Sequence, residues 1–226
     1  MTFIIAIQLN DSIIITADKR KVVLKEEGEV HFDTDEISKI HAYDKGIITG
    51  TGENYVISRT VEIFKQIANS NLNVLPQCLN LSRKIRELEI GTDYFQIENT
   101  KLLCSSYSED GTQLYKIERC DPSQTYELIA IKPMSITIWL FNPNVEAISE
   151  DLKNLYVYLK DYKSFENDID WINYYINRLA PIYQKQSLHD PYMSSNFDFL
   201  FQAKDEYITG HIPNADSSII EFEMIS

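Results

Sequence analysis

Thr2 is the first residue of the sequence that could do chemistry, because removal of Met1 would leave a hydroxyl and a free α-amine on one residue. Such an amine can act as the base that activates the hydroxyl, and the two groups form a complete nucleophile and base for covalent catalysis. Asp18 follows at the end of a second apolar run, where antiparallel pairing would return its carboxylate to the side of Thr2. We therefore expect these two residues to share one site.

A lysine and a pair of glycines supply two further groups. Lys39 begins an apolar run, and its ammonium near Asp18 would lower the pKa of a neighbouring hydroxyl. Gly50-Thr51-Gly52 precedes a segment of helical periodicity, so its backbone N–H groups would suit a developing oxyanion. The plainer alternatives are that Asp18 only ends a hairpin, that Lys39 is a solvated charge, and that the glycines only allow a tight turn.

The first fifty residues predict strands. Two apolar runs, residues 3–8 and 13–17, flank turn-forming residues and predict a β-hairpin. Neither run alternates, which favours strands that are covered on both faces. Residues 19–36 are charged and aperiodic and indicate a loop or an exposed ribbon, whereas residues 37–43 and 46–49 indicate another strand pair.

Helical periodicity begins at Glu53 and returns over residues 75–90, where a proline stands early and a glycine follows. The remaining segments predict four strands, two helices and a closing hairpin, over residues 101–107, 113–118, 126–131, 136–141, 145–162, 169–186, 197–203 and 207–212. The order β, αα, β, αα, β predicts an α+β fold, a four-layer αββα sandwich with helices outside two facing sheets. No repeat or linker interrupts it, so residues 1–226 are predicted to form a single domain.

The start of the chain resembles a proteasome β-type subunit, an N-terminal-nucleophile (Ntn) threonine peptidase. The resemblance is carried over residues 2–70 by Thr2 before an apolar run, Ala17-Asp18-Lys19-Arg20 after the second run, Lys39-Ile40, and Gly50-Thr51-Gly52 before a helix. It implies that Thr2 is the nucleophile, that Asp18 and Lys39 complete the site, and that the Gly52 N–H stabilises the oxyanion. The longer spacing from Asp18 to Lys39 is explained by a charged insertion at residues 25–35.

Two later segments are compared with patterns of the same family. Asp190-Pro191-Tyr192-Met193-Ser194 is similar to the family's Asp-x-x-Ser-Gly-Gly, in which the Asp and the Ser support the amine of the threonine. Here the serine, Ser194, stands one position later and the glycines are absent. Residues 130–135 are aligned with a Gly-Ser-Gly-Ser turn that orients the N-terminus in the family, which puts Pro133 at the supporting serine and leaves Ser135 as a substitute.

Composition excludes several classes of function. The formal net charge of −13 disfavours nucleic acids and anionic membrane surfaces as partners. No apolar run is long enough for a membrane span, and the start of the chain lacks a signal-peptide pattern. Three cysteines without CxxC spacing and four unclustered histidines indicate no disulfide framework, metal or cofactor. A cytoplasmic protein is expected. The tyrosines of its predicted helices, among them Tyr183, are expected to pack against a sheet.

The resemblance predicts a hydrolase that cleaves peptide or amide bonds through Thr2. Two alternatives stay open: an inactive structural or binding protein that keeps Met1 and the fold, and a small-molecule amidase on the same fold. Assembly with copies of the same chain, as a ring or a dimer, is implied by the family, whereas an ATPase partner is not specified.

Overall fold

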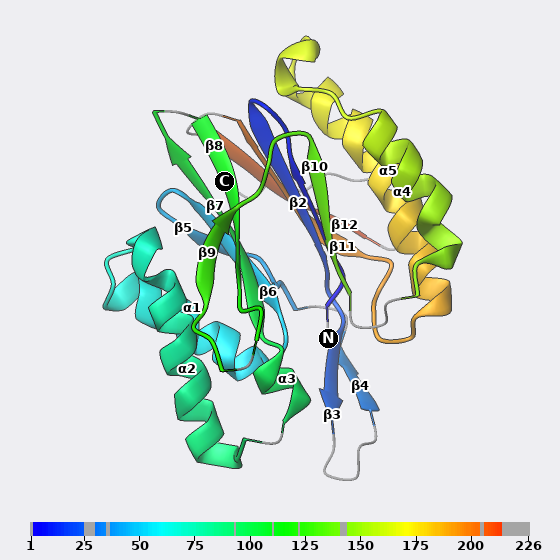
Figure 1. The fold of residues 1–226 in the computed structure, drawn as a ribbon. Coiled ribbons are helices and arrows are strands. Elements are labelled where there is room, and N and C mark those ends of the chain that lie inside the picture. Colours follow the sequence, from blue (N-terminus) through cyan, green and yellow to red (C-terminus); the bar gives the residue numbers. More distant parts are fainter. Residues whose placement is uncertain are drawn as a thin grey trace. The chain divides into compact units, whose positions relative to one another are not determined.

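The computed structural model describes residues 2–24, 30–34, 37–92, 94–109, 111–121, 123–140, 144–203 and 206–213. The chain divides into two compact units, one formed by Met1–Lys39 with Lys132–Ser226 and the other by Ile40–Ile131 (Figure 1). Each unit contains a five-stranded antiparallel sheet and its own helices. The α+β class that the sequence predicts is therefore confirmed, whereas the single domain over residues 1–226 stays a prediction.

The sheet of the first unit has the strand order β10-β1-β2-β11-β12. Its strands in chain order are β1 (Ile4–Gln8), β2 (Ser12–Asp18), β10 (Ser135–Trp139), β11 (Phe197–Ala203) and β12 (Glu206–Ile212). Every residue of β1 and β2 is buried, as the lack of alternation predicts. The two strands form the predicted hairpin around Asn10-Asp11, closed by the Leu9 N–H on the Ser12 carbonyl at 2.9 Å.

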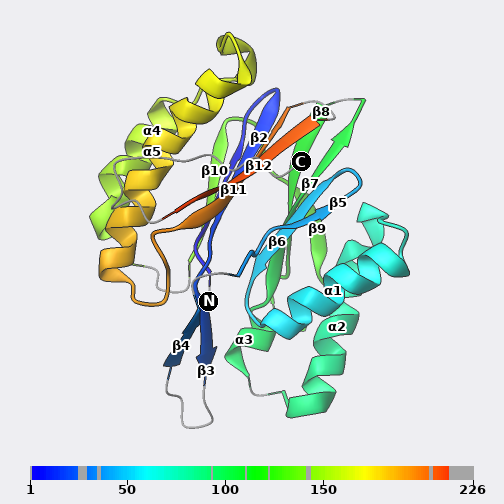
Figure 2. The ribbon, with the colours of Figure 1, turned by 180° about the vertical axis from the view of Figure 1, so that it is seen from behind.

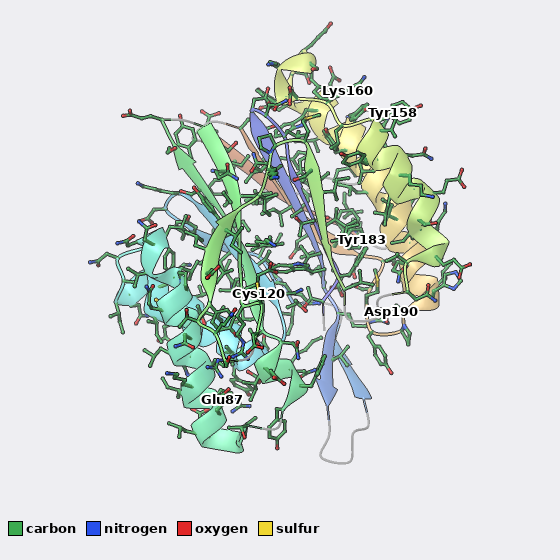
Figure 3. All side chains as sticks on the ribbon, viewed as in Figure 1. Glu87, Cys120, Tyr158, Lys160, Tyr183 and Asp190 are labelled. Carbon is green, nitrogen blue, oxygen red and sulfur yellow. The ribbon has the colours of Figure 1, made fainter. Side chains whose placement is uncertain are left out.

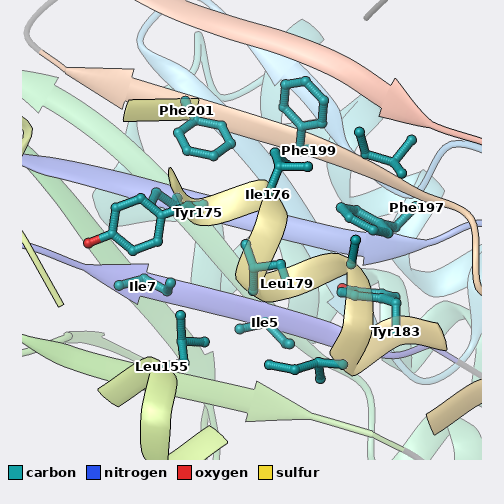
Figure 4. Close-up of a cluster of buried hydrophobic side chains, with 14 of the residues drawn as sticks. Ile5, Ile7, Leu155, Tyr175, Ile176, Leu179, Tyr183, Phe197, Phe199 and Phe201 are labelled. Atoms are coloured by element: carbon teal, nitrogen blue, oxygen red, sulfur yellow. The ribbon is translucent and has the colours of Figure 1, made fainter. Parts of the chain in front are cut away.

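Two helices, α4 (Ser149–Val157) and α5 (Asp168–His189), cover one face of this sheet (Figure 2). Short 3-10 turns precede them at Glu146–Ile148 and Tyr162–Ser164. The core between helices and sheet is aromatic, because the alternate β11 residues Phe197, Phe199 and Phe201 all face α5 (Figure 4). The unit also contains a two-stranded ribbon, β3 (Lys21–Leu24) with β4 (Val30–Thr34), within the charged segment.

The second unit has the strand order β5-β6-β7-β8-β9. Its strands are β5 (His41–Tyr43), β6 (Gly46–Thr51), β7 (Lys101–Ser108), β8 (Gly111–Glu118) and β9 (Glu127–Ala130). Its helices are α1 (Asn54–Gln66), α2 (Leu75–Ile90) and the short α3 (Phe95–Glu98), with a 3-10 turn at Leu72–Val74. Side chains of α1 and α2, among them Val56, Phe64 and Leu79, form a second core with β6, β7 and β8.

Several predicted bounds differ from the structure. The strand predicted over residues 37–43 is confined to β5, and the helix predicted over residues 145–162 is confined to α4 and the preceding turn. In the second case Tyr158 leaves the helical conformation after Val157, with φ −103° and ψ 24°, and apolar residues continue beyond it. Periodicity therefore extended the prediction past the true end of the helix. Within the described part of the chain, none of the helices is both long and apolar enough to cross a membrane.

Candidate active site

The β1–β2 hairpin brings Asp18 to the residue that follows Thr2. Ile4 lies opposite Ala17, and the Asp18 N–H donates to the Phe3 carbonyl at 3.0 Å. The Phe3 N–H is directed instead to the Asp18 side chain and donates to Oδ1 at 2.7 Å. Thr2 is buried, with 7% of its surface exposed. Hairpin register alone therefore produces the proximity that the sequence predicts.

The Asp18 carboxylate is fully buried and accepts hydrogen bonds on both oxygens. Oδ1 also accepts from the Lys39 ammonium at 2.7 Å, so the predicted pairing of Asp18 with Lys39 is present. Oδ2 accepts the Arg20 N–H at 3.1 Å and the Ser194 N–H at 3.3 Å. All of these partners donate to Asp18. Its carboxylate therefore accepts hydrogen bonds from three backbone N–H groups and from the Lys39 ammonium, and each of its two oxygens has two donors.

Ser194, which is distant in the sequence, contacts Asp18 and the residue after it. Its side chain is buried, its Oγ accepts the Lys19 N–H at 3.0 Å, and its hydroxyl donates to the Asn196 carbonyl at 2.9 Å. Ser194, which stands one position later than the serine of the family's pattern, is thus hydrogen-bonded to Lys19, the residue after Asp18. The structure brings Asp18, Lys39 and Ser194 together, and support of the Thr2 amine by Ser194 stays a prediction.

Asp190 is the C-cap of α5 and is buried, with 3% of its surface exposed. Its carboxylate accepts the Tyr192 N–H at 2.9 Å. Burial raises the pKa of Asp190 above its usual range; the negative charge of Asp18 raises it further, and the Arg20 guanidinium opposes the shift. Arg20 also donates from Nη1 to the Pro191 carbonyl at 2.8 Å. Sequence reasoning gave Arg20 no role, although it stands in the Ala17-Asp18-Lys19-Arg20 segment that carried the resemblance.

Gly52 belongs to the second unit, where it precedes α1. It has φ +118°, a conformation that side chains rarely adopt, and an added Cβ would lie 2.4 Å from the Thr100 Cα. The N-cap of α1 is Glu53, whose carboxylate accepts the Val56 N–H at 2.8 Å, so this helix end already carries an anion. Within the described part of the chain, no residue accepts a hydrogen bond from the Gly52 N–H.

The assignment of Pro133 to the site was wrong. Ser135 lies opposite Gln8 in the β1–β10 pairing, and Ile4 lies opposite Trp139. Thr2 is six residues from Gln8 along the strand direction, about 20 Å at the usual rise per residue. The turn at residues 130–135 is therefore at the opposite end of β1 from Thr2. β10 itself runs toward the Thr2 end of β1, and residues 141–143 lie outside the described residues.

The described residues contain no group of three or more histidine, cysteine, aspartate or glutamate side chains that could hold a metal ion. Of the three cysteines, Cys78 and Cys104 are buried and Cys120 is exposed. Cys104 is fully buried on β7, and burial raises the pKa of its thiol well above the usual range. Such a thiol keeps its proton and is a poor nucleophile.

Comparison with solved structures finds a likeness over almost the whole chain. The Gly-1 mutant of Anbu from Hyphomicrobium sp. strain MC1 superimposes with a TM-score of 0.63 at 12% sequence identity, covering 96% of this chain and 89% of that one. Anbu from Yersinia bercovieri, described as an ancestral beta-subunit, gives a TM-score of 0.62 at 11% identity, covering 89% and 81%. No family model matches the sequence, and no curated protein matches it.

At these identities the likeness shows the fold alone. The chain has a proteasome-like Ntn fold, built from two antiparallel sheets with helices, in agreement with the fold class that the sequence predicts.

Proposed function

We propose that this chain is an Ntn hydrolase that cleaves peptide or amide bonds with Thr2 after Met1 has been removed. The observation that carries the proposal is the Asp18 carboxylate, which holds the Phe3 N–H and the Lys39 ammonium on a single oxygen, each at 2.7 Å. A cation with 13% of its side chain exposed is thereby fixed beside the residue that follows Thr2. An ammonium in such a place would favour the alkoxide form of a nearby hydroxyl.

In the proposed reaction the Thr2 oxygen attacks the carbonyl carbon of the substrate while its proton passes to the Thr2 α-amine. The Gly52 N–H would donate to the oxygen of the tetrahedral intermediate. The C–N bond then breaks, and the departing amine takes the proton from the α-amine. Water hydrolyses the resulting Thr2 ester by the same sequence and releases the carboxylic acid. Asp190 and Ser194 would support the geometry around the Thr2 amine. For Ser194, this support would pass through its hydrogen bonds with Asp18 and Lys19.

The test is the intact mass of the purified protein before and after incubation with a peptide epoxyketone. This probe reacts with both the hydroxyl and the amine of an N-terminal threonine, so one adduct reports both groups. We expect a protein that lacks Met1 and gains one probe. Thr2→Ala should gain none, and Lys39→Met should react at least tenfold more slowly than the parent. Lys185→Met, which removes an ammonium from the exposed Lys185–Asp151 pair, is the matched control and should react normally.

Retained Met1 with no adduct would overturn the proposal and favour the non-catalytic alternative. That alternative takes its support from Met193, which stands at the family's serine position, and from the absence of the two glycines after it. Hydrolysis of small amides but of no peptide would favour an amidase on the same fold.

We also propose that copies of this chain assemble with one another. Five large apolar residues are more than half exposed: Tyr156 and Val157 on α4, Tyr158 at the C-cap of α4, and Ile169 and Leu188 on α5. Contiguous exposed apolar residues are typical of surfaces that are covered in an assembly, and Tyr156, Val157 and Tyr158 are consecutive in the sequence. Size-exclusion chromatography with light scattering should give a mass above the 26.3 kDa of one chain. A mass of 26.3 kDa at all concentrations would exclude the assembly.

A further inference from the structure

Tyr183 of α5 is a buried polar residue to which the proposed reaction gives no role. It is fully buried, and Figure 3 labels it on α5 together with Asp190, the residue that caps the end of this helix. The ring is stacked on Phe197 with a centroid distance of 4.2 Å (Figure 4). It also makes an edge contact with the Phe3 ring of the β1–β2 hairpin, at a centroid distance of 4.8 Å. Packing of this kind leaves the ring one position and so fixes where its hydroxyl can lie.

The Tyr183 hydroxyl lies between two oxygens of the hairpin. It is 3.0 Å from the Thr16 Oγ1 and 3.3 Å from the Phe3 carbonyl oxygen. The Thr16 hydroxyl itself donates to the Ile5 carbonyl at 3.2 Å, so its oxygen is free to accept from Tyr183. Burial raises the pKa of Tyr183 well above the usual range for tyrosine, so the hydroxyl retains its proton and remains a donor.

The Phe3 carbonyl accepts the Asp18 N–H from the neighbouring strand, and it shares the single proton of the Tyr183 hydroxyl with the Thr16 Oγ1. The N–H of the same residue is held by the Asp18 carboxylate. Phe3 follows Thr2 directly, so these contacts restrain the peptide bond that joins the two residues. The strand pairing restrains Phe3 within the sheet, and Tyr183 adds a restraint from the helix side.

We propose that Tyr183 is a positioning residue for Thr2, whose hydroxyl holds Phe3 in the place that aligns the nucleophile. Tyr183 touches neither the substrate nor the reacting atoms and acts through Phe3. The inference rests on the proposed function for its effect on the reaction. Displacements of about 1 Å in a reacting group can reduce a rate by about two orders of magnitude, so the loss of one restraint is expected to be measurable.

The experiment compares Tyr183→Phe with Tyr175→Phe. Tyr175 lies two turns earlier on α5, is also fully buried, and hydrogen bonds through its hydroxyl to the Lys160 backbone. Both substitutions remove one buried hydroxyl from the same helix and leave the ring, but only Tyr183 contacts Phe3. A loss that reflects stability alone would therefore occur in both variants.

The first measurement is amide hydrogen exchange at Phe3. Thr2-Phe3 is the one Thr-Phe pair in the sequence, so labelling threonine with a ¹³C carbonyl and phenylalanine with ¹⁵N isolates its N–H in an NMR spectrum. The second is epoxyketone labelling, from which the maximal rate and the half-saturating concentration are obtained separately. For Tyr183→Phe we expect exchange at Phe3 to be about tenfold faster and the maximal labelling rate about tenfold lower, with unchanged half-saturation. Tyr175→Phe should match the parent in both.

The outcomes separate this inference from the proposed function. If Phe3 exchange is faster only in Tyr183→Phe but the parent protein is never labelled, the restraint stands and the proposed hydrolase is overturned. If exchange is faster but the labelling rate of Tyr183→Phe equals that of the parent, Tyr183 does not position Thr2. Equal behaviour of the two tyrosine variants in both measurements would overturn the inference entirely.

Discussion

Phe3 and Asp18 are joined twice, because the Asp18 N–H donates to the Phe3 carbonyl at 3.0 Å and the Phe3 N–H donates to the Asp18 Oδ1 at 2.7 Å. The second bond replaces the backbone acceptor that continued strand pairing would provide. The end of the hairpin is thereby held by a carboxylate that also binds an ammonium. Stability and the candidate site consequently depend on the same buried group.

Lys39→Met should therefore reduce stability as well as reactivity. The substitution leaves the fully buried Asp18 carboxylate without its cation, which costs about 3 kcal/mol in comparable buried pairs. Urea unfolding should show this loss of unfolding free energy. Lys185→Met removes an ion pair of the same 2.7 Å length at an exposed position and should cost less than about 1 kcal/mol. Equal losses in the two variants would contradict a structural role for the Lys39–Asp18 pair.

Ser194→Ala should lower the free energy of unfolding by about 1–2 kcal/mol, because the Lys19 N–H loses its acceptor in a buried place. Chemical denaturation measures this difference. Ser187→Ala is the control, since the Ser187 hydroxyl donates only within its own helix, to the Gln184 carbonyl. That variant should remain within about 0.5 kcal/mol of the parent. A neutral Ser194→Ala would show that its hydroxyl does not fix the residue after Asp18.

Asp190 should make stability decline as the pH rises from about 3.8 toward neutrality. Burial raises its pKa in the folded state, so between the unfolded and the folded pKa the native protein binds the proton more tightly. Deprotonation therefore costs stability at higher pH. Asp190→Asn does not titrate and keeps an oxygen for the Tyr192 N–H. Its stability relative to the parent should increase with pH in urea unfolding measured from pH 4 to pH 7.

Asp121→Asn should change the pH dependence of stability in the direction opposite to Asp190→Asn. Hydrogen bonds from Ser123 lower the pKa of Asp121, so this carboxylate contributes stability above its unfolded pKa and loses that contribution as the pH falls. The stability of Asp121→Asn relative to the parent should therefore decrease as the pH rises. A difference for Asp190→Asn that is independent of pH would mean that its carboxyl has an ordinary pKa.

Gly52→Ala should destabilise the protein more than Gly111→Ala. Both glycines have positive φ, +118° and +109°, which costs a non-glycine residue about 1–3 kcal/mol. Only at Gly52 would the new Cβ also meet backbone, 2.4 Å from the Thr100 Cα, whereas nothing lies within 4 Å of it at Gly111. Thermal unfolding should show a clearly larger decrease in melting temperature for Gly52→Ala. Equal decreases would indicate that Thr100 moves aside without cost.

Local sequence was sufficient to predict most strands and helices and the approach of Asp18 to Thr2. Uninterrupted β-branched runs predicted β1 and β2 as fully buried strands, because only side chains covered on both faces dispense with alternation. A short turn between the runs fixed the hairpin register, so the approach of Asp18 to Thr2 could be read from spacing. Helix bounds were less accurate where apolar residues continue past the end of the helix, as after Val157.

Tertiary structure decided the rest of the site, because its contacts join residues that no local pattern relates. Ser194 reaches Asp18 across 176 positions, and Tyr183 reaches Phe3 across 180. The β1–β10 register moved Pro133 to the far end of the strand from Thr2, since the pairing of distant strands depends on the whole sheet. The sequence thus determined which residue types were present and the nearest pairings. Packing of α5 and β11 against the hairpin determined which of those residues contact Phe3, Asp18 and Lys19.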